Sequence, residues 1–134
     1  MADVEDAISR VPLFANLSKN DRKKLAASMK ERTFPVGTVI TEVGSSGVGF
    51  FIIDSGTATV VLGESRTRTL TSGDYFGEIA LIDGGPRTAR ITADTELRCY
   101  GLTSWEFRPF VQARPDVAWA LLQNLAQRIR DQQE

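Results

Sequence analysis

Residues 50–62 read Phe-Phe-Ile-Ile-Asp-Ser-Gly-Thr-Ala-Thr-Val-Val-Leu, which is two short apolar runs around a polar turn. The first run is Phe50–Ile53 and the second is Thr57–Leu62, and both are rich in the β-branched and aromatic residues that favour strands. Between the runs, Gly56 can adopt the positive φ that tight turns require. The stretch therefore predicts a β-hairpin.

Similar short runs continue outward on both sides of this hairpin. Glycine-containing or serine-containing turns separate them, and no long helical pattern lies between them. Further strands are expected at residues 38–41, 67–70, 90–93 and 97–102. Many short strands at steady intervals are typical of an antiparallel barrel or jelly roll.

Helical patterns flank the predicted strands on both sides. In the N-terminal segment, Ser18 begins a candidate capping box of a helix whose apolar face carries Leu25 and Met29. In the C-terminal segment, Pro115 suits the first turn of the last helix. An apolar stripe follows along this last helix, made of Ala118, Leu121, Leu122, Leu125 and Ile129. The stripe predicts either docking on the chain's own barrel or a dimer seam.

The composition fits one domain with this organisation. The chain has 134 residues, of which 42% are hydrophobic and 25% are charged, as is usual for a globular domain. We predict a single domain over residues 1–134, mainly β with flanking helices. It would consist of an N-terminal helical segment over residues 1–32, an antiparallel β jelly-roll barrel over residues 33–102 and C-terminal helices over residues 103–134.

The charge balance and the missing residue types exclude several function classes. Sixteen Lys and Arg residues oppose seventeen Asp and Glu residues, so a net charge of −1 gives no basic surplus for duplex DNA or an anionic membrane. The sequence contains no histidine and a single cysteine, Cys99, which excludes histidine-based catalysis, histidine metal sites and thiolate metal clusters. No apolar run approaches the length of a membrane span, and the acidic N-terminus is unlike a signal peptide. We therefore expect a cytoplasmic protein without a bound metal or a membrane segment.

Residues 76–89 read Phe-Gly-Glu-Ile-Ala-Leu-Ile-Asp-Gly-Gly-Pro-Arg-Thr-Ala. In this stretch Gly77 allows a ligand to approach the backbone, and the carboxylate of Glu78 precedes the guanidinium of Arg87 by nine residues. A carboxylate can accept hydrogen bonds from sugar hydroxyls. One arginine, with N–H groups of a short helix beginning near Ile79, can hold a singly charged phosphate without magnesium. The set suits a small anionic nucleotide, although Glu78 and Arg87 alone would be interpreted as a surface ion pair.

The same stretch closely resembles the phosphate-binding cassette of cyclic nucleotide-binding domains, the sensor domains of catabolite activators and protein kinase regulatory subunits. The resemblance covers nearly the whole chain. Residues 35–44 are similar to the family's opening strand and turn, residues 51–60 to its central hairpin, and residues 73–81 with 86–89 to its cassette. Glycine turns at matching intervals, together with both halves of the cassette, make a chance match unexpected.

The resemblance implies a role for each residue of the cassette. Gly77 and Glu78 would meet the ribose, and Arg87 would pair with the exocyclic oxygens of the cyclic phosphate. Backbone N–H groups at Ala80 and around Thr88 would complete the anion site. The implied ligand-binding residues are Phe76, Gly77, Glu78, Ile79, Ala80, Arg87, Thr88 and Ala89.

The implied ligand is cAMP or cGMP, bound without a cofactor. Candidate base contacts are Val61, Arg128 and Arg130, although a solvated helical face explains the two arginines equally well. A hydroxyl after the cassette arginine, here Thr88, can favour guanine in this family, but it also occurs in domains that prefer adenine. We expect a preference for cAMP.

The leading functional hypothesis is a non-catalytic sensor in which the last helix closes over the base as a lid and signals to a partner. The partner would be an effector protein or a second copy, contacted through the C-terminal helix. A metal-dependent cupin enzyme on a similar jelly roll would need the histidines that this sequence lacks. A carboxylate-only hydrolase is conceivable, but the only acids near Glu78 in the sequence are Asp74 and Asp83. Direct DNA binding is not expected, because no helix-turn-helix follows the last helix.

Two alternative functions remain open from the sequence alone. The chain could be a structural jelly-roll domain that no longer binds a ligand, although Glu78 and Arg87 argue against this. It could also be a sensor domain cut from a larger channel, kinase or transcription regulator.

Overall fold

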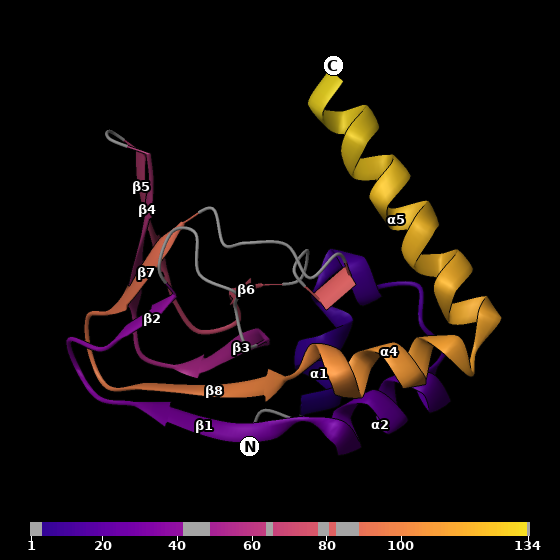
Figure 1. The fold of residues 1–134 in the computed structure, drawn as a ribbon, viewed down its shortest axis with the longest axis horizontal. Coiled ribbons are helices and arrows are strands. Elements are labelled where there is room, and N and C mark those ends of the chain that lie inside the picture. Colours follow the sequence, from indigo (N-terminus) through magenta and orange to yellow (C-terminus); the bar gives the residue numbers. More distant parts are fainter. Residues whose placement is uncertain (1–3, 42–48, 64–65, 78–80, 83–88, 134) are drawn as a thin grey trace. The chain divides into compact units, whose positions relative to one another are not determined.

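The computed structural model describes residues 4–41, 49–63, 66–77, 81–82 and 89–133 (Figure 1). The chain divides into two compact units. The helical unit contains Met1–Ser28 and Trp105–Glu134, and the sheet unit contains Met29–Ser104. Helices at both ends of the sequence and strands between them agree with the predicted order, while the single domain stays a prediction.

Two four-stranded antiparallel sheets make up the sheet unit, in the strand orders β1-β8-β3-β6 and β2-β7-β4-β5. The strands are β1 (Lys30–Phe34), β2 (Val39–Thr41), β3 (Phe50–Ser55), β4 (Ala58–Leu62), β5 (Arg66–Leu70), β6 (Tyr75–Phe76), β7 (Arg90–Ala93) and β8 (Leu97–Leu102). The predicted class, mainly β with flanking helices, is confirmed. The described strands do not close into the predicted barrel, because β1 and β6 end one sheet and β2 and β5 end the other.

The hairpin predicted for residues 50–62 is wrong, although both of its strands are present. Strand β3 pairs with β6 and β8, whereas β4 pairs with β5 and β7, so the turn at Gly56 leads from one sheet into the other. Phe51 of β3 and Val60 of β4 nevertheless join the same core cluster. The two strands are therefore related by packing of their faces and not by pairing of their edges.

Gly56 forms the corner between the two sheets. Its φ is 101°, and a Cβ at this position would lie 2.3 Å from the carbonyl oxygen of Glu96 and 3.1 Å from the Cα of Leu97. The carbonyl of the next residue, Thr57, accepts a hydrogen bond of 2.9 Å from the amide of Asp94. The corner thus needs glycine both for its backbone conformation and for the close approach of a second segment.

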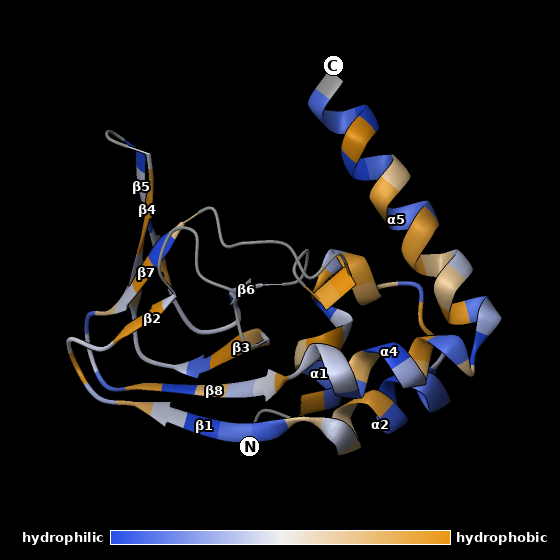
Figure 2. Cartoon of the chain, viewed as in Figure 1, coloured by the Kyte–Doolittle hydropathy of each residue, from blue (hydrophilic) through white to orange (hydrophobic). Residues whose placement is uncertain are grey.

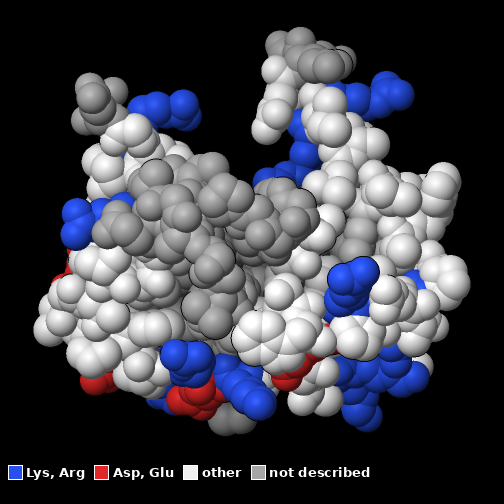
Figure 3. Space-filling model, in the orientation of Figure 1, with Lys and Arg blue, Asp and Glu red and all other residues white. Residues whose placement is uncertain are grey.

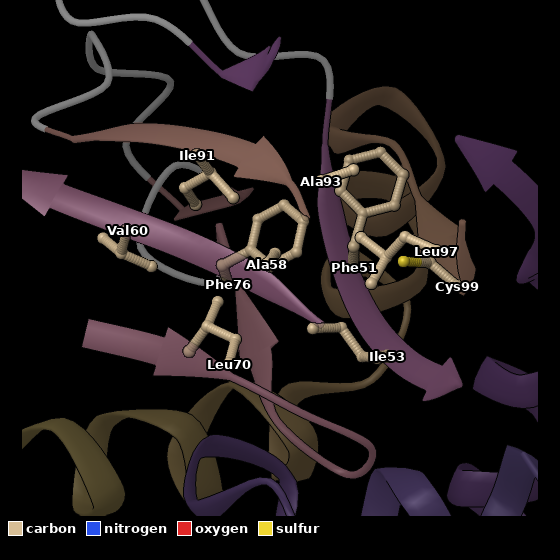
Figure 4. Packing of buried hydrophobic residues seen from close by; sticks show 10 residues of the cluster. All are labelled: Phe51, Ile53, Ala58, Val60, Leu70, Phe76, Ile91, Ala93, Leu97 and Cys99. Atoms are coloured by element: carbon tan, nitrogen blue, oxygen red, sulfur yellow. The ribbon is translucent and has the colours of Figure 1, made fainter. Parts of the chain in front are cut away.

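The core of the sheet unit takes residues from both sheets. Its buried residues are Phe51, Ile53, Ala58, Val60, Leu70, Phe76, Ile91, Ala93, Leu97 and Cys99 (Figure 4). The ring of Phe51 contacts that of Phe34 edge-on at a centroid distance of 5.6 Å and that of Phe76 at 5.3 Å. Such aromatic pairs contribute about 0.5–1.5 kcal/mol beyond the area that they bury. One cluster therefore holds the two sheets together.

Helix α2 (Lys19–Ser28) begins where predicted but ends earlier. The hydroxyl of Ser18 accepts a hydrogen bond of 3.1 Å from the amide of Asp21, as a helix cap does. Strand β1 then begins at Lys30, within the segment for which the sequence predicts helix up to residue 32. Because β1 pairs with β8 along its whole length, long-range pairing overrides the local helical pattern.

The helical unit has a core of its own. Its helices are α1 (Val4–Ser9), η1 (Pro12–Phe14), α2, α4 (Ser104–Gln112) and α5 (Pro115–Gln133). The rings of Phe14 and Phe107 meet edge-on at 5.9 Å, and the side-chain amide of Asn124 donates a hydrogen bond of 2.9 Å to the carbonyl of Leu13. These contacts dock α4 and α5 on η1.

Hydrophobic residues follow one another along α5 between hydrophilic ones (Figure 2), but the predicted apolar stripe is only partly buried. Leu121 is buried together with Val117 and Ala120, whereas Leu122 and Ile129 are each 57% exposed. The buried row on α5 is therefore shifted from the predicted one. None of the described helices combines the length and the hydropathy needed to span a bilayer.

Cys99 lies in the core with none of its surface exposed. Burial raises the pKa of its thiol from an ordinary value of 9.0 to about 12. We therefore expect the native protein to resist alkylation by iodoacetamide at pH 8, since the thiolate is the reactive form. The stability that this burial provides is lost as the pH rises from about 9 towards about 12, because the unfolded thiol ionises first. Mass spectrometry should show slow labelling of the folded protein and fast labelling in urea, and fast labelling of both would contradict the burial of Cys99.

Candidate functional site

The cassette predicted over residues 76–89 begins and ends on the core of the sheet unit. At its start, Phe76 on β6 is 6% exposed and packs on Phe51. At its end, Ala89 packs against the same cluster, and its carbonyl accepts a hydrogen bond of 3.0 Å from the hydroxyl of Thr41 on β2. Both ends of the cassette are therefore anchored on one core.

Gly77 turns the chain at the start of the cassette. Its φ is 89°, a conformation that other residues rarely adopt. The amide of Leu81 donates a hydrogen bond of 3.3 Å to the carbonyl of Gly77, which is the residue spacing of an α-helical turn. Leu81 is helical and 4% exposed, so it fixes this part of the cassette to the interior. A short helix near this point agrees with the expectation from the sequence.

The structure places only part of the predicted ligand site. The predicted residues that lie outside the described part of the chain are Glu78, Ile79, Ala80, Arg87 and Thr88. Their roles stay predictions, whereas Phe76, Gly77 and Ala89 are placed as described above. Among the residues that the structure describes, no group of three or more Cys, Asp and Glu side chains is arranged to hold a metal ion.

The candidate base contacts lie in both units. Val61 on β4 is half-buried, and its neighbours Val60 and Leu62 both pack on the core. Because successive side chains of a strand point to opposite faces, Val61 faces away from that core. Arg128 is half-buried and Arg130 is exposed, and both lie on α5 in the helical unit. A contact between any of these residues and a base stays a prediction.

Two arginines that the sequence pattern does not single out lie on the core-facing side of the second sheet. Arg68 on β5 lies opposite Val60, and Arg66 lies opposite Leu62. Directly opposite residues of an antiparallel pair share one face, so both arginines lie on the face that carries the core. Alternation along residues 57–62 indicates two faces, but only the strand register shows which residues of β5 share the inner one.

Comparisons with solved structures identify the same fold in other proteins. The chain is 33% identical to the N-terminal domain of a transcriptional regulator from Streptomyces coelicolor A3(2), with a TM-score of 0.83 over 95% of this chain and 94% of that one. It is 26% identical to the Catabolite Activator Protein of Thermus thermophilus, with a TM-score of 0.73 over 91% of this chain and 60% of that one. The predicted jelly-roll relationship is confirmed, with sheets that do not close.

Sequence comparisons agree with the structural ones. A cAMP-dependent protein kinase regulatory subunit of Colletotrichum orbiculare is 32% identical over 106 residues, which are 78% of this chain and 27% of that protein. Human potassium/sodium hyperpolarization-activated cyclic nucleotide-gated channel 1 is 34% identical over 108 residues, 81% of this chain and 12% of the channel. The chain thus spans about a quarter of the length of the kinase regulatory subunit and about an eighth of the length of the channel. A family model described as the cyclic nucleotide-binding domain matches residues 31–114, so the chain belongs to the cyclic nucleotide-binding domain family.

Proposed function

We propose that this chain is a non-catalytic sensor domain that binds a 3′,5′-cyclic nucleotide, cAMP or cGMP, in the cassette over residues 76–89. The observation that carries the proposal is the anchoring of both cassette ends, Phe76 and Ala89, on one core. A family membership that covers the cassette supports the ligand class. Relatives named for cAMP-dependent and cyclic nucleotide-gated proteins support it further.

The proposed contacts follow from the chemistry of the ligand. Glu78 accepts a hydrogen bond from the ribose 2′-hydroxyl, and Arg87 pairs with the exocyclic phosphate oxygens. Backbone N–H groups of Ala80, Thr88 and Ala89 complete the anion site. They follow the turn at Gly77, which has a positive φ. A carboxylate that reads the 2′-hydroxyl rejects a deoxy analogue, because the buried acceptor would otherwise stay unpaired.

The proposed signal is a change in the helical unit. Its own core, formed around η1, lets it respond as one body. We assign α5 the role of the element that closes over the base and contacts an effector or a second copy. A ligand can drive such a response only if it binds two conformations with different affinity.

Titration with cAMP and cGMP, followed by thermal unfolding, tests the proposal. A ligand at one hundred times its Kd adds about 2.7 kcal/mol to the free energy of unfolding, which for a domain of this size raises the Tm by about 5–15 °C. 5′-AMP and 2′-deoxy-cAMP serve as controls and should have much smaller effects. Chromatography of the incubated cAMP should show no AMP. Titrations without heat and unchanged melting for both cyclic nucleotides would contradict the proposed function.

A further inference from the structure

The outward side of helix α2 is strongly cationic. Its basic residues are Lys19, Arg22, Lys23 and Lys24. Asp21 and Leu25 are buried, and Lys23 lies two residues from each of them, so it points to the opposite side of the helix. Lys19 lies one turn before Lys23 on the same side, and both are exposed. Figure 3 shows Lys and Arg side chains gathered over α2, at the lower right of the view.

The described acidic side chains do not pair with this face. Asp21, the acid of α2 itself, is turned inward, where its carboxylate lies 3.6 Å from the Nε of Arg114. In the part of the chain that the structure describes, the basic side chains of α2 form no ion pair and no hydrogen bond. The cationic face is therefore available to an anionic partner.

These charges do not stabilise the helix that carries them. Lys19 occupies the first turn of α2, where the helix dipole disfavours a cation. Lys19 and Lys23 lie one turn apart, and like charges at this spacing repel each other. Charges that weaken their own helix are explained better by binding than by folding.

The composition of the face is unlike that of a protein interface. The centres of such interfaces are enriched in aromatic residues, Met and Arg, and they are depleted in Lys. Beside its cations, α2 exposes Asn20 and Ala27. Neither residue offers the large side chain that usually anchors a protein partner.

The face is also poorly matched to the backbone of a nucleic acid. Duplex phosphates have fixed positions and are held mostly by Arg and Lys forks and by amides at helix N-termini. The one arginine of α2, Arg22, is half-buried. At the N-terminus of α2, the amide of Asp21 already donates a hydrogen bond of 3.1 Å to the hydroxyl of Ser18. Most of the charge is therefore carried by flexible lysines.

An anionic lipid surface matches such a set of lysines, because the headgroups of a fluid bilayer can move to meet them. Each basic residue near such a surface strengthens binding by about fivefold. We propose that the outward face of α2 binds the headgroups of an anionic bilayer. The absence of large apolar side chains among its exposed residues keeps the contact at the surface, without insertion into the hydrocarbon.

The net charge of −1 does not oppose this contact. At physiological ionic strength a charge acts over only about 8 Å, so a bilayer responds to the side chains that face it and not to the whole chain. The local charge of α2 thus overrides the expectation, based on the net charge, that an anionic membrane finds no basic surplus.

Sedimentation of the 134-residue chain with lipid vesicles tests this inference. The vesicles contain phosphatidylcholine with about one third phosphatidylserine, or phosphatidylcholine alone. Four basic residues predict half-maximal binding at about 1 mM accessible anionic lipid surface. Lys19→Gln/Lys23→Gln should lower the partition coefficient about twenty-five-fold, which is fivefold for each lysine. Salt at about 1 M should abolish the binding, because charges are then screened beyond about 3 Å.

Arg66→Gln/Arg68→Gln is the matched control. It removes two exposed cations from β5 in the sheet unit and gives the same net charge as the lysine variant. It should change the partition coefficient by less than about twofold, because these charges do not belong to α2. Thermal unfolding checks that both variants are folded, and Lys19→Gln/Lys23→Gln should melt no lower than the wild type.

Several outcomes would overturn the proposal. They are the absence of binding to phosphatidylserine vesicles, equal binding to both kinds of vesicle, and the same loss in both double variants. Duplex DNA of random sequence, at the same phosphate concentration, should bind more weakly than the anionic vesicles. Tighter binding of DNA that is lost in Lys19→Gln/Lys23→Gln would assign the face to nucleic acid and reject the lipid surface.

Discussion

Replacement of Arg87 by alanine is expected to weaken the binding of both cyclic nucleotides by about 2–5 kcal/mol, the range for truncating one partner of a buried charge pair. The corresponding rise in Kd is roughly thirtyfold to several thousandfold. The reason is that the cyclic phosphate loses its bidentate partner and keeps only backbone N–H donors. Calorimetry with cAMP and cGMP measures both values.

Two control variants separate this effect from a general loss of charge. Arg87→Lys keeps the charge but loses the paired geometry, so it should recover only part of the affinity. Arg98→Ala removes an exposed arginine that pairs with Glu31 on β1, and it should leave both affinities unchanged. Because the phosphate is common to both ligands, Arg87→Ala should affect cAMP and cGMP alike. Unchanged affinity for both nucleotides would remove Arg87 from the site.

The second large effect is expected from Gly56→Ala at the corner between the sheets. The left-handed backbone costs about 1–2 kcal/mol for a residue with a Cβ. Overpacking against the carbonyl of Glu96, 2.3 Å from the added carbon, costs about 1–3 kcal/mol more, because a backbone atom cannot rotate away. Urea unfolding should therefore show a loss of about 2–5 kcal/mol.

Gly37→Ala provides the matched comparison. Gly37 also has a positive φ, of 86°, but a Cβ at this position meets no atom within 4 Å. Its replacement should cost only the backbone part, about 1–2 kcal/mol. If the two variants lost the same stability, the close approach at the corner would have no energetic weight, and the explanation given for Gly56 would fail.

Local patterns predict most strands of this fold but not their partners. Residues 50–62 have the composition of two strands around a turn, and both strands form. Their assignment to different sheets depends on contacts such as those of Phe51 and Val60 in a shared core, which no local window contains. Strand β1 shows the same limit more strongly. Its residues from Lys30 to Thr33 are all exposed, and it becomes a strand only by pairing with β8.

In the candidate site, too, the sequence predicts local features but not those that depend on strand pairing. The residue types in the cassette predict an anionic nucleotide because their chemistry is local: a glycine, a carboxylate and a guanidinium within one short stretch. The face that a side chain occupies is not local. Val61 is a candidate base contact from the sequence, but only the register shows that Val60 and Arg68 share one face and that Val61 lies on the other. A shift of one residue in that register would exchange the two sets of side chains.

The two open sheets have a consequence for how copies of this chain behave at high concentration. A sheet that does not close leaves backbone N–H and C=O groups at its edges, where another chain could add a strand and start a fibril. In the described part of the sheets, two edges are very short, since β6 has two residues and β2 has three. The longer edges carry charged side chains, Lys30, Glu31 and Arg32 on β1 and Arg66 and Arg68 on β5, and charges on an edge strand disfavour its pairing with another chain. The short or charged edges of the described strands thus disfavour the addition of a strand from another copy.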